Sequence, residues 1–166
     1  IIAEAFKEVG KNGVVTMEIS NDSATSYEVI NGAAIDKPLK NFHFITDEAK
    51  KEAVLENPLV LIIENKIENI RKIQSVLEYV ITNNKPLLII GEADEQVVSA
   101  LAMNKLKGNI KVNIIDTPDF GIYRKQKLQD LAMLTGATVV NEDLGDDLDM
   151  IEVELLGTCL KSITND

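Results

Sequence analysis

Residues 59–90 read LVLIIENKIENIRKIQSVLEYVITNNKPLLII and contain a complete strand–helix–strand unit. The apolar runs Leu59–Ile63 and Leu87–Ile90 are continuous, which is typical of strands covered on both faces of a parallel sheet. Between them, apolar residues recur at helical spacing over 68–81, and the polar segment 82–86 ends that helix at a proline. The unit therefore predicts two parallel strands joined by a helical crossover.

The same alternation continues beyond residue 90. We predict helices over 94–106 and 124–134, ended by Gly108 and Gly136, and strands over 112–115 and 137–140. This order predicts the α/β class, as a parallel-sheet layered domain flanked by helices. In the tail, 151–156 favours a short helix and 158–163 a returning strand.

The segment before this domain has a different character. We predict a helix over 2–9, followed by strands over 14–19 and 26–30 that form a small β-hairpin stalk. Gly32 follows as a natural pivot, so we divide the chain into a stalk over 1–31 and a main domain over 32–166. The first residues resemble a helix entered midway, which favours a piece of a longer protein.

The amino-acid composition limits which partners and which kinds of site we expect. Hydrophobic residues make up 45% of the 166 residues and aromatic residues only 4%, so we expect an aliphatic core. The net charge of −10 disfavours nucleic acid and anionic membrane surfaces as partners. His43 and Cys159 are the single histidine and the single cysteine, so we predict no metal site. A lone cysteine fits a reducing compartment, and we expect a cytoplasmic location.

The predicted strand ends lack the motifs of nucleotide binding. Neither a GxGxxG nor a GxxxxGK[ST] sequence occurs, and no serine or cysteine nucleophile is paired with His43 in a recognisable motif. The acidic residues Glu92, Asp94, Glu95 and Asp116 are candidates for a catalytic or metal-binding cluster, but Asp94 and Glu95 favour a helix N-terminus through capping and the helix dipole. We therefore predict no catalytic residue. The alternative is an α/β enzyme domain that binds a small anion or nucleotide at the carboxyl ends of its strands.

Two of the predicted helices carry more apolar surface than a sheet requires. In the helix over 68–81, Leu77 and Ile81 lie at one edge of a wide apolar arc, and the helix over 94–106 is apolar almost all round. The excess surface is either covered by segment 33–55, buried in an oligomer, or exposed as a groove. Periodicity alone favours covering, whereas two adjacent helices make a natural trough and Met103 suits varied partners.

From Ile2–Val15 to Leu134–Val140, several segments in register are similar to group I chaperonins of the GroEL family. Ile2–Val15 resembles the end of the intermediate domain of that family. The segments that resemble its apical domain are Lys66–Arg71, Lys85–Ile90, Pro118–Gly121 with Arg124 and Lys125, and Leu134–Val140. The resemblance covers nearly the whole chain and identifies it as a divergent apical-domain fragment.

The resemblance implies a molecular chaperone without chemistry of its own in this segment. Non-native polypeptides and the mobile loop of a co-chaperonin would bind an apolar groove between two helices and a preceding loop. The positions that match the groove are Leu39, Asn41, His43, Phe44, Gln74, Leu77, Val98, Ala102 and Met103. Leu39 and His43 stand where the family has aromatic residues, and Gln74 replaces an aliphatic one, so the groove would be less aromatic and more polar than is typical.

The resemblance also implies a larger assembly. Gly32 matches the hinge glycine of the family. ATP and Mg²⁺ would bind an equatorial domain of the parent protein, which would hydrolyse ATP and self-associate into a ring. The cytoplasm would be its location, with an organellar matrix or a virus-infected cell as alternatives.

Overall fold

The computed structural model describes residues 1–10, 15, 17, 24–27, 29 and 32–165. The chain divides into two compact units, Ile1–Ala34 and Ile35–Asp166. In the first unit, helix α1 (Ile2–Val9) confirms the helix predicted over 2–9. The strands predicted over 14–19 and 26–30 fall largely outside the described residues. Gly32 is exposed and belongs to the end of the first unit.

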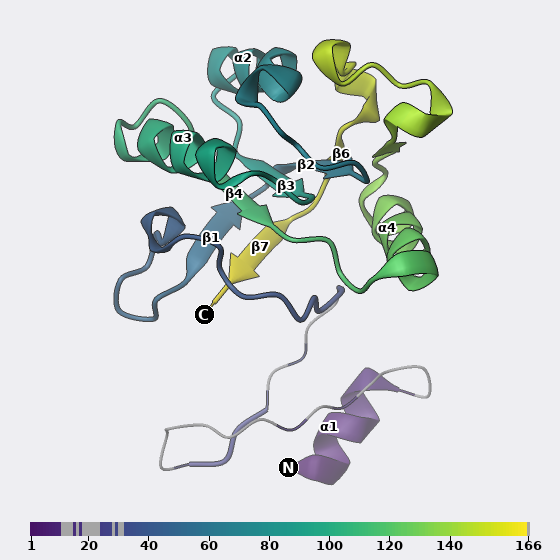
Figure 1. Ribbon diagram of the computed structural model, residues 1–166. Helices are drawn as coiled ribbons and strands as arrows, with labels where there is room; N and C mark the ends of the chain where they lie inside the picture. The colour runs from purple at the N-terminus through teal and green to yellow at the C-terminus, as the bar shows by residue number, and fades with distance from the viewer. Residues whose placement is uncertain (11–14, 16, 18–23, 28, 30–31, 166) are drawn as a thin grey trace. The chain divides into compact units, whose positions relative to one another are not determined.

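The second unit is built on a mostly parallel sheet (Figure 1). Its strands are β2 (Leu59–Ile63), β3 (Leu87–Ile90), β4 (Val112–Ile115) and β5 (Val139–Val140), in the spatial order β4-β3-β2-β5. All neighbours in this order are parallel. The short strand β6 (Gly157–Thr158) pairs antiparallel with the first residues of β2, on the side where β5 pairs with its last residues. The α/β class and the parallel sheet are confirmed.

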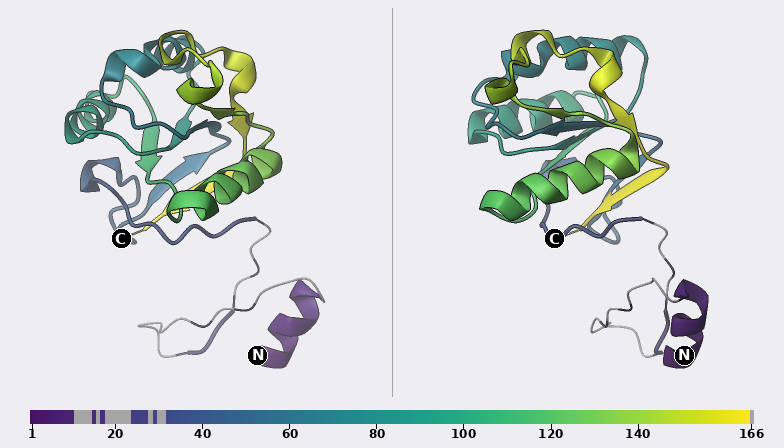
Figure 2. Two further views of the ribbon diagram at one scale, coloured as in Figure 1. Left: turned by 45° about the vertical axis from the view of Figure 1, so that its right-hand side comes forward. Right: turned by 90° about the vertical axis from the view of Figure 1, so that its right-hand side faces the viewer.

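Helices cover both faces of this sheet (Figure 2). Helix α2 (Gln74–Thr82), which the 3-10 turn η2 (Ile70–Ile73) precedes, and helix α3 (Glu95–Leu106) lie on one face. Helix α4 (Gly121–Thr135) lies on the other face and ends at Gly136, which adopts the left-handed conformation with φ 71°. The crossover from β4 to β5 therefore runs on the opposite face from the first two, because it returns past β2 in the opposite direction.

The alternation of side chains along the strands divides the core between the two faces. Leu61 and Ile63 of β2 pack with α2 and α3, whereas Val60 and Ile62 pack with α4. All four side chains are completely buried. Burial on both faces is the reason why β2 and β3 are continuous apolar runs in the sequence.

A second, two-stranded antiparallel sheet pairs β1 (Ala53–Glu56) with β7 (Lys161–Thr164). The prediction of a single strand over 158–163 is wrong, because this segment contributes to two strands that lie in different sheets. The chain leaves β6 in the main sheet, turns at Cys159 and Leu160, and enters β7 in the small sheet. The helix predicted over 151–156 is reduced to one 3-10 turn, η5 (Val153–Leu155). Two further turns, η3 (Glu142–Leu144) and η4 (Leu148–Met150), lie between β5 and η5.

Candidate functional site

The flank of α2 that carries Leu77 faces away from the C-terminal segment. Ser75 Oγ donates a hydrogen bond to the carbonyl oxygen of Ile151 at 3.3 Å, and η4 packs against α2 on this side. Leu77 lies about 200° around the helix axis from Ser75, so it belongs to the opposite flank together with Ile81. Figure 1 places α3 on that side of α2.

The exposed residues of α2 and α3 form what we call the outer helical surface. Gln74 is exposed, Leu77 is half-buried, and Ile81, Met103 and Leu106 are exposed by 50%, 52% and 53%. These helices bury Val76, Val80 and Leu101 on the sheet, so the surface is additional to their core-facing stripe. Three large apolar side chains therefore remain half in water on neighbouring helices.

Three positions that the resemblance assigns to the groove belong to the core. Phe44 and Ala102 are 1% exposed and Val98 is 7% exposed, and all three pack with the α2 and α3 side of the sheet. Their side chains offer no surface to a bound polypeptide in this conformation. The accessible surface is therefore smaller than the nine predicted positions, and Met103 is the exposed position among the three on α3.

The preceding loop is attached to α3. Lys105 Nζ donates to the carbonyl oxygen of Ile45 at 2.6 Å, and burial lowers the pKa of Lys105. The 3-10 turn η1 (Phe42–Phe44) begins at Asn41, whose side chain accepts from the backbone N–H of His43 at 2.9 Å. Leu39 packs against the core from its half-buried position. The loop is therefore held by its own contacts to the domain.

The sequence interpretation missed Phe42, which the structure places at the surface of this loop. Phe42 is 70% exposed, and its ring centroid lies 4.1 Å from that of the half-buried His43. Phe44, two residues later, is buried. The apolar and aromatic character of residues 42–45 was visible in the sequence, but only the 3-10 turn decides which phenylalanine faces outward.

The opposite helical layer is also apolar on its outside. Ile122, Tyr123 and Leu134 on α4 are exposed, and Met133 is 83% exposed. A cavity of about 600 Å³ lies beside the end of this helix, lined in part by Met133, Ala137 and Leu144. Apolar exposure alone therefore does not distinguish the α2 and α3 layer from the α4 layer.

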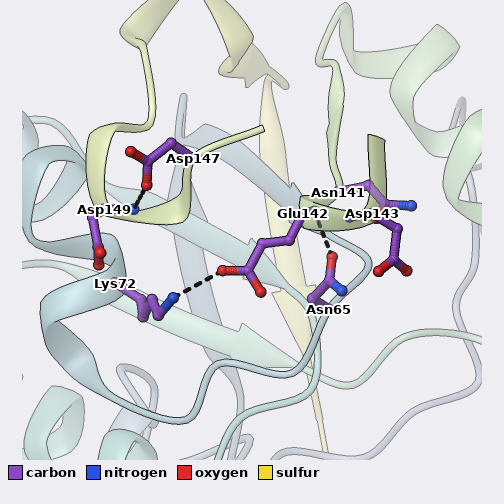
Figure 3. A network of polar contacts seen from close by, with 7 residues as sticks. All are labelled: Asn65, Lys72, Asn141, Glu142, Asp143, Asp147 and Asp149. Atoms are coloured by element: carbon purple, nitrogen blue, oxygen red, sulfur yellow. Dashed lines mark hydrogen bonds and ion pairs between the residues drawn. The ribbon is translucent and has the colours of Figure 1, made fainter. Parts of the chain in front are cut away.

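The carboxyl ends of β2 and β5 are closed by their own polar side chains (Figure 3). Strand order reverses between these two strands, which is where open α/β sheets commonly bind ligands. Asn141 is buried there, and its Nδ2 donates to Glu64 Oε2 at 2.6 Å. The backbone N–H of Glu142 donates to Asn65 Oδ1 at 2.9 Å. These hydrogen bonds join the segment that follows β2 to the segment that follows β5.

Acidic residues surround this closed position without forming one cluster. Glu142 Oε1 accepts from Lys72 Nζ at 2.8 Å, and this hydrogen bond raises the pKa of Lys72. The backbone N–H of Asp143 donates to the side chain of Asn141. The backbone N–H of Asp149 donates to the side chain of Asp147. The acidic side chains thus project from separate turns (Figure 3).

Three of the four carboxylates considered as a catalytic or metal-binding group are paired with different cations. Asp94 pairs with Lys66, Asp116 with Lys40 at 2.5 Å, and Glu92 with Arg124 at 3.6 Å. Asp94 occupies the N-cap position of α3, as predicted, but its carboxylate makes no capping bond. Over the described part of the chain, no three His, Cys, Asp or Glu side chains are arranged to hold a metal ion.

Two further findings do not depend on any one site. Within the residues that the structure covers, no helix is both long enough and apolar enough to cross a membrane. No protein-family model matches the sequence.

Proposed function

We propose that the second unit captures non-native polypeptides on the outer helical surface, as the apical domain of a chaperonin does. The observation that carries the proposal is the exposure of Ile81, Met103 and Leu106, each about half in water on two neighbouring helices. The choice of this layer over α4 rests on the resemblance and on the loop at η1, which contacts α3 and adds Phe42.

The proposed mechanism is burial of apolar area without a chemical step. Burial yields about 25 cal/mol per Å², so a few half-exposed side chains supply only a few kcal/mol before the costs of association. A free energy of about 4 kcal/mol corresponds to a dissociation constant near 1 mM, so one domain binds weakly. The ring that the resemblance implies would combine several such sites, and avidity would then give useful affinity.

The wider cycle is part of the same proposal. A co-chaperonin loop would compete for the outer helical surface, and rotation at Gly32 would remove that surface from the captured chain. ATP and Mg²⁺ would drive this rotation from an equatorial domain of the parent protein. The segment described here then contributes no catalytic residue.

A matched pair of variants tests the proposal. Met103→Glu places a charge on the outer helical surface, and Met133→Glu places the same charge on α4, at a methionine that is more exposed. We expect Met103→Glu to weaken binding of a fluorescent, extended apolar peptide at least tenfold, a change of about 1.4 kcal/mol, and Met133→Glu to leave it unchanged. Fluorescence anisotropy measures the affinity, and circular dichroism confirms that both variants are folded.

Other outcomes of this experiment favour other functions. Equal loss in both variants contradicts capture on α2 and α3. Binding of ATP without binding of the peptide favours the α/β enzyme alternative. A stable oligomer of this chain that protects Met103 from solvent favours a permanent interface in place of capture.

A further inference from the structure

A cavity of about 300 Å³ lies at the carboxyl edge of the sheet, and its lining does not include the residues that bond at the closed position around Asn141. Its lining comes from the segments that follow β2, β3 and β4 and from the segment that leads into η1. Its lining residues are Lys37, Lys40, Lys66, Glu92, Ala93, Asp116, Thr117 and Phe120. The polypeptide-binding positions on α2 and α3 are not among them.

One buried polar group in this lining lacks a partner. Thr117 is 2% exposed, and its Oγ1 has no hydrogen-bond partner among the described residues. An unpaired buried hydroxyl typically costs about 1–3 kcal/mol. Asn141, which is equally buried, has partners for both atoms of its side-chain amide. The unpaired hydroxyl of Thr117 is thus a group that a bound ligand would satisfy.

The lining is positively charged in a strongly negative chain. Three lysines and two carboxylates line the cavity, whereas the whole chain has a net charge of −10. Lys40 pairs with Asp116, and Lys66 pairs with Asp94. Lys37 has no carboxylate partner among the described residues, and its Nζ lies 5.2 Å from the centre of the Phe120 ring. An anion would supply the missing partner of Lys37.

The start of α4 adds to this positive potential. Phe120 is the N-cap residue of this 15-residue helix and makes no side-chain capping bond, and the first turn contains no acidic residue. The N-terminus of a long helix carries a partial positive charge that favours anions. Helix α3 differs, because Glu95 lies in its first turn. The start of α4 borders the cavity through its N-cap residue Phe120.

We infer that this cavity binds a small anion through a phosphate or carboxylate group. Lys37 Nζ supplies the unpaired charge, the Thr117 hydroxyl supplies a hydrogen-bond donor, and the start of α4 supplies the favourable potential. Lys40 and Lys66 are paired with Asp116 and Asp94. This site is separate from the proposed polypeptide surface and involves no chemical step.

The test is a titration of the whole chain with inorganic phosphate and, separately, with acetate, at low ionic strength. Amide chemical shifts measured by NMR report the binding. We expect saturable shifts confined to residues 37–40, 92–94 and 116–121 with at least one of the two anions. The anion that gives the tighter curve identifies the chemical class of the ligand.

Three variants separate a defined site from general attraction. Lys37→Ala and Thr117→Val are expected to weaken binding at least tenfold, whereas Lys85→Ala, which removes an equal charge before the amino end of β3, leaves it unchanged. Thr117→Val keeps the side-chain shape and removes the unpaired hydroxyl, so the variant should remain folded. Absence of saturation with both anions, or equal weakening by all three variants, overturns the inference. Met103→Glu should not affect anion binding, so the two proposals fail independently.

Discussion

The helical layer of α2 and α3 and the layer of α4 bury similar side chains against the sheet but expose different side chains to solvent. On the sheet side, α3 buries Leu101 and α4 buries Leu128, each almost completely. On the solvent side, Met103 of α3 is half exposed, whereas Met133 of α4 is exposed over most of its surface. The α2 and α3 layer nevertheless offers two adjacent helices and an attached loop, whereas α4 is the single helix of its layer among the described residues. The comparison teaches that the arrangement of apolar residues, and not their exposure alone, supports a binding surface.

The inner faces of the two layers provide the largest expected effect. Leu101→Ala and Leu128→Ala each remove a buried side chain and leave a cavity, which typically costs about 2–5 kcal/mol. We expect both variants to lower the free energy of unfolding by similar amounts in urea denaturation. A negligible cost for Leu128→Ala alone would mean that α4 is not part of the cooperative core.

A close backbone approach distinguishes the α4 layer. A Cβ atom at Gly157 of β6 would lie 2.6 Å from the carbonyl oxygen of Thr135 and 2.7 Å from the backbone nitrogen of Ala137. Gly157→Ala therefore forces the end of α4 away from the sheet, and we expect a loss of about 3 kcal/mol in the free energy of unfolding.

Gly136→Ala is the matched control for this clash. Gly136 lies at the same helix end, but a Cβ atom there would meet nothing within 4 Å. Its cost should come only from the left-handed backbone conformation, about 1–2 kcal/mol. If both variants lose the same free energy, the contact between β6 and the end of α4 is looser than described.

The smallest expected effect concerns Cys159, which packs against the core on the α4 side. Burial raises the pKa of its thiol, so the reactive thiolate is scarcer near neutral pH than in the unfolded chain. We expect slower labelling by a thiol reagent in the folded protein than in urea, and the rate should rise as pH increases toward the raised pKa. Equal rates in both states would show that this edge of the core is open.

Much of the fold was predictable because its strands are buried on both faces. The predicted bounds of β2, β3 and β4 agree with the structure, since a continuous apolar run admits few other interpretations. The segment from Glu142 to Leu155 was not predictable in the same way. Half of its residues are acidic, and it forms isolated 3-10 turns, which lack the periodicity of a longer helix.

The candidate sites were harder to predict from the sequence than the buried strands. Helix α3 is apolar on nearly all sides, so the pattern alone does not reveal that Val98 and Ala102 face the sheet and Met103 faces solvent. Thr117 follows β4, and the resemblance assigns no role to it. Only the folded structure shows that its hydroxyl is buried without a partner and that Lys37 and Phe120 line the same cavity.

The most direct test of polypeptide capture is the location of a bound peptide. An apolar peptide that carries a photoreactive side chain can be crosslinked to the chain, and mass spectrometry can identify the attached residues. We predict crosslinks within 74–81 of α2, 99–106 of α3 and at Phe42. Crosslinks concentrated on 121–144, along α4 and the segment that follows it, would contradict the account.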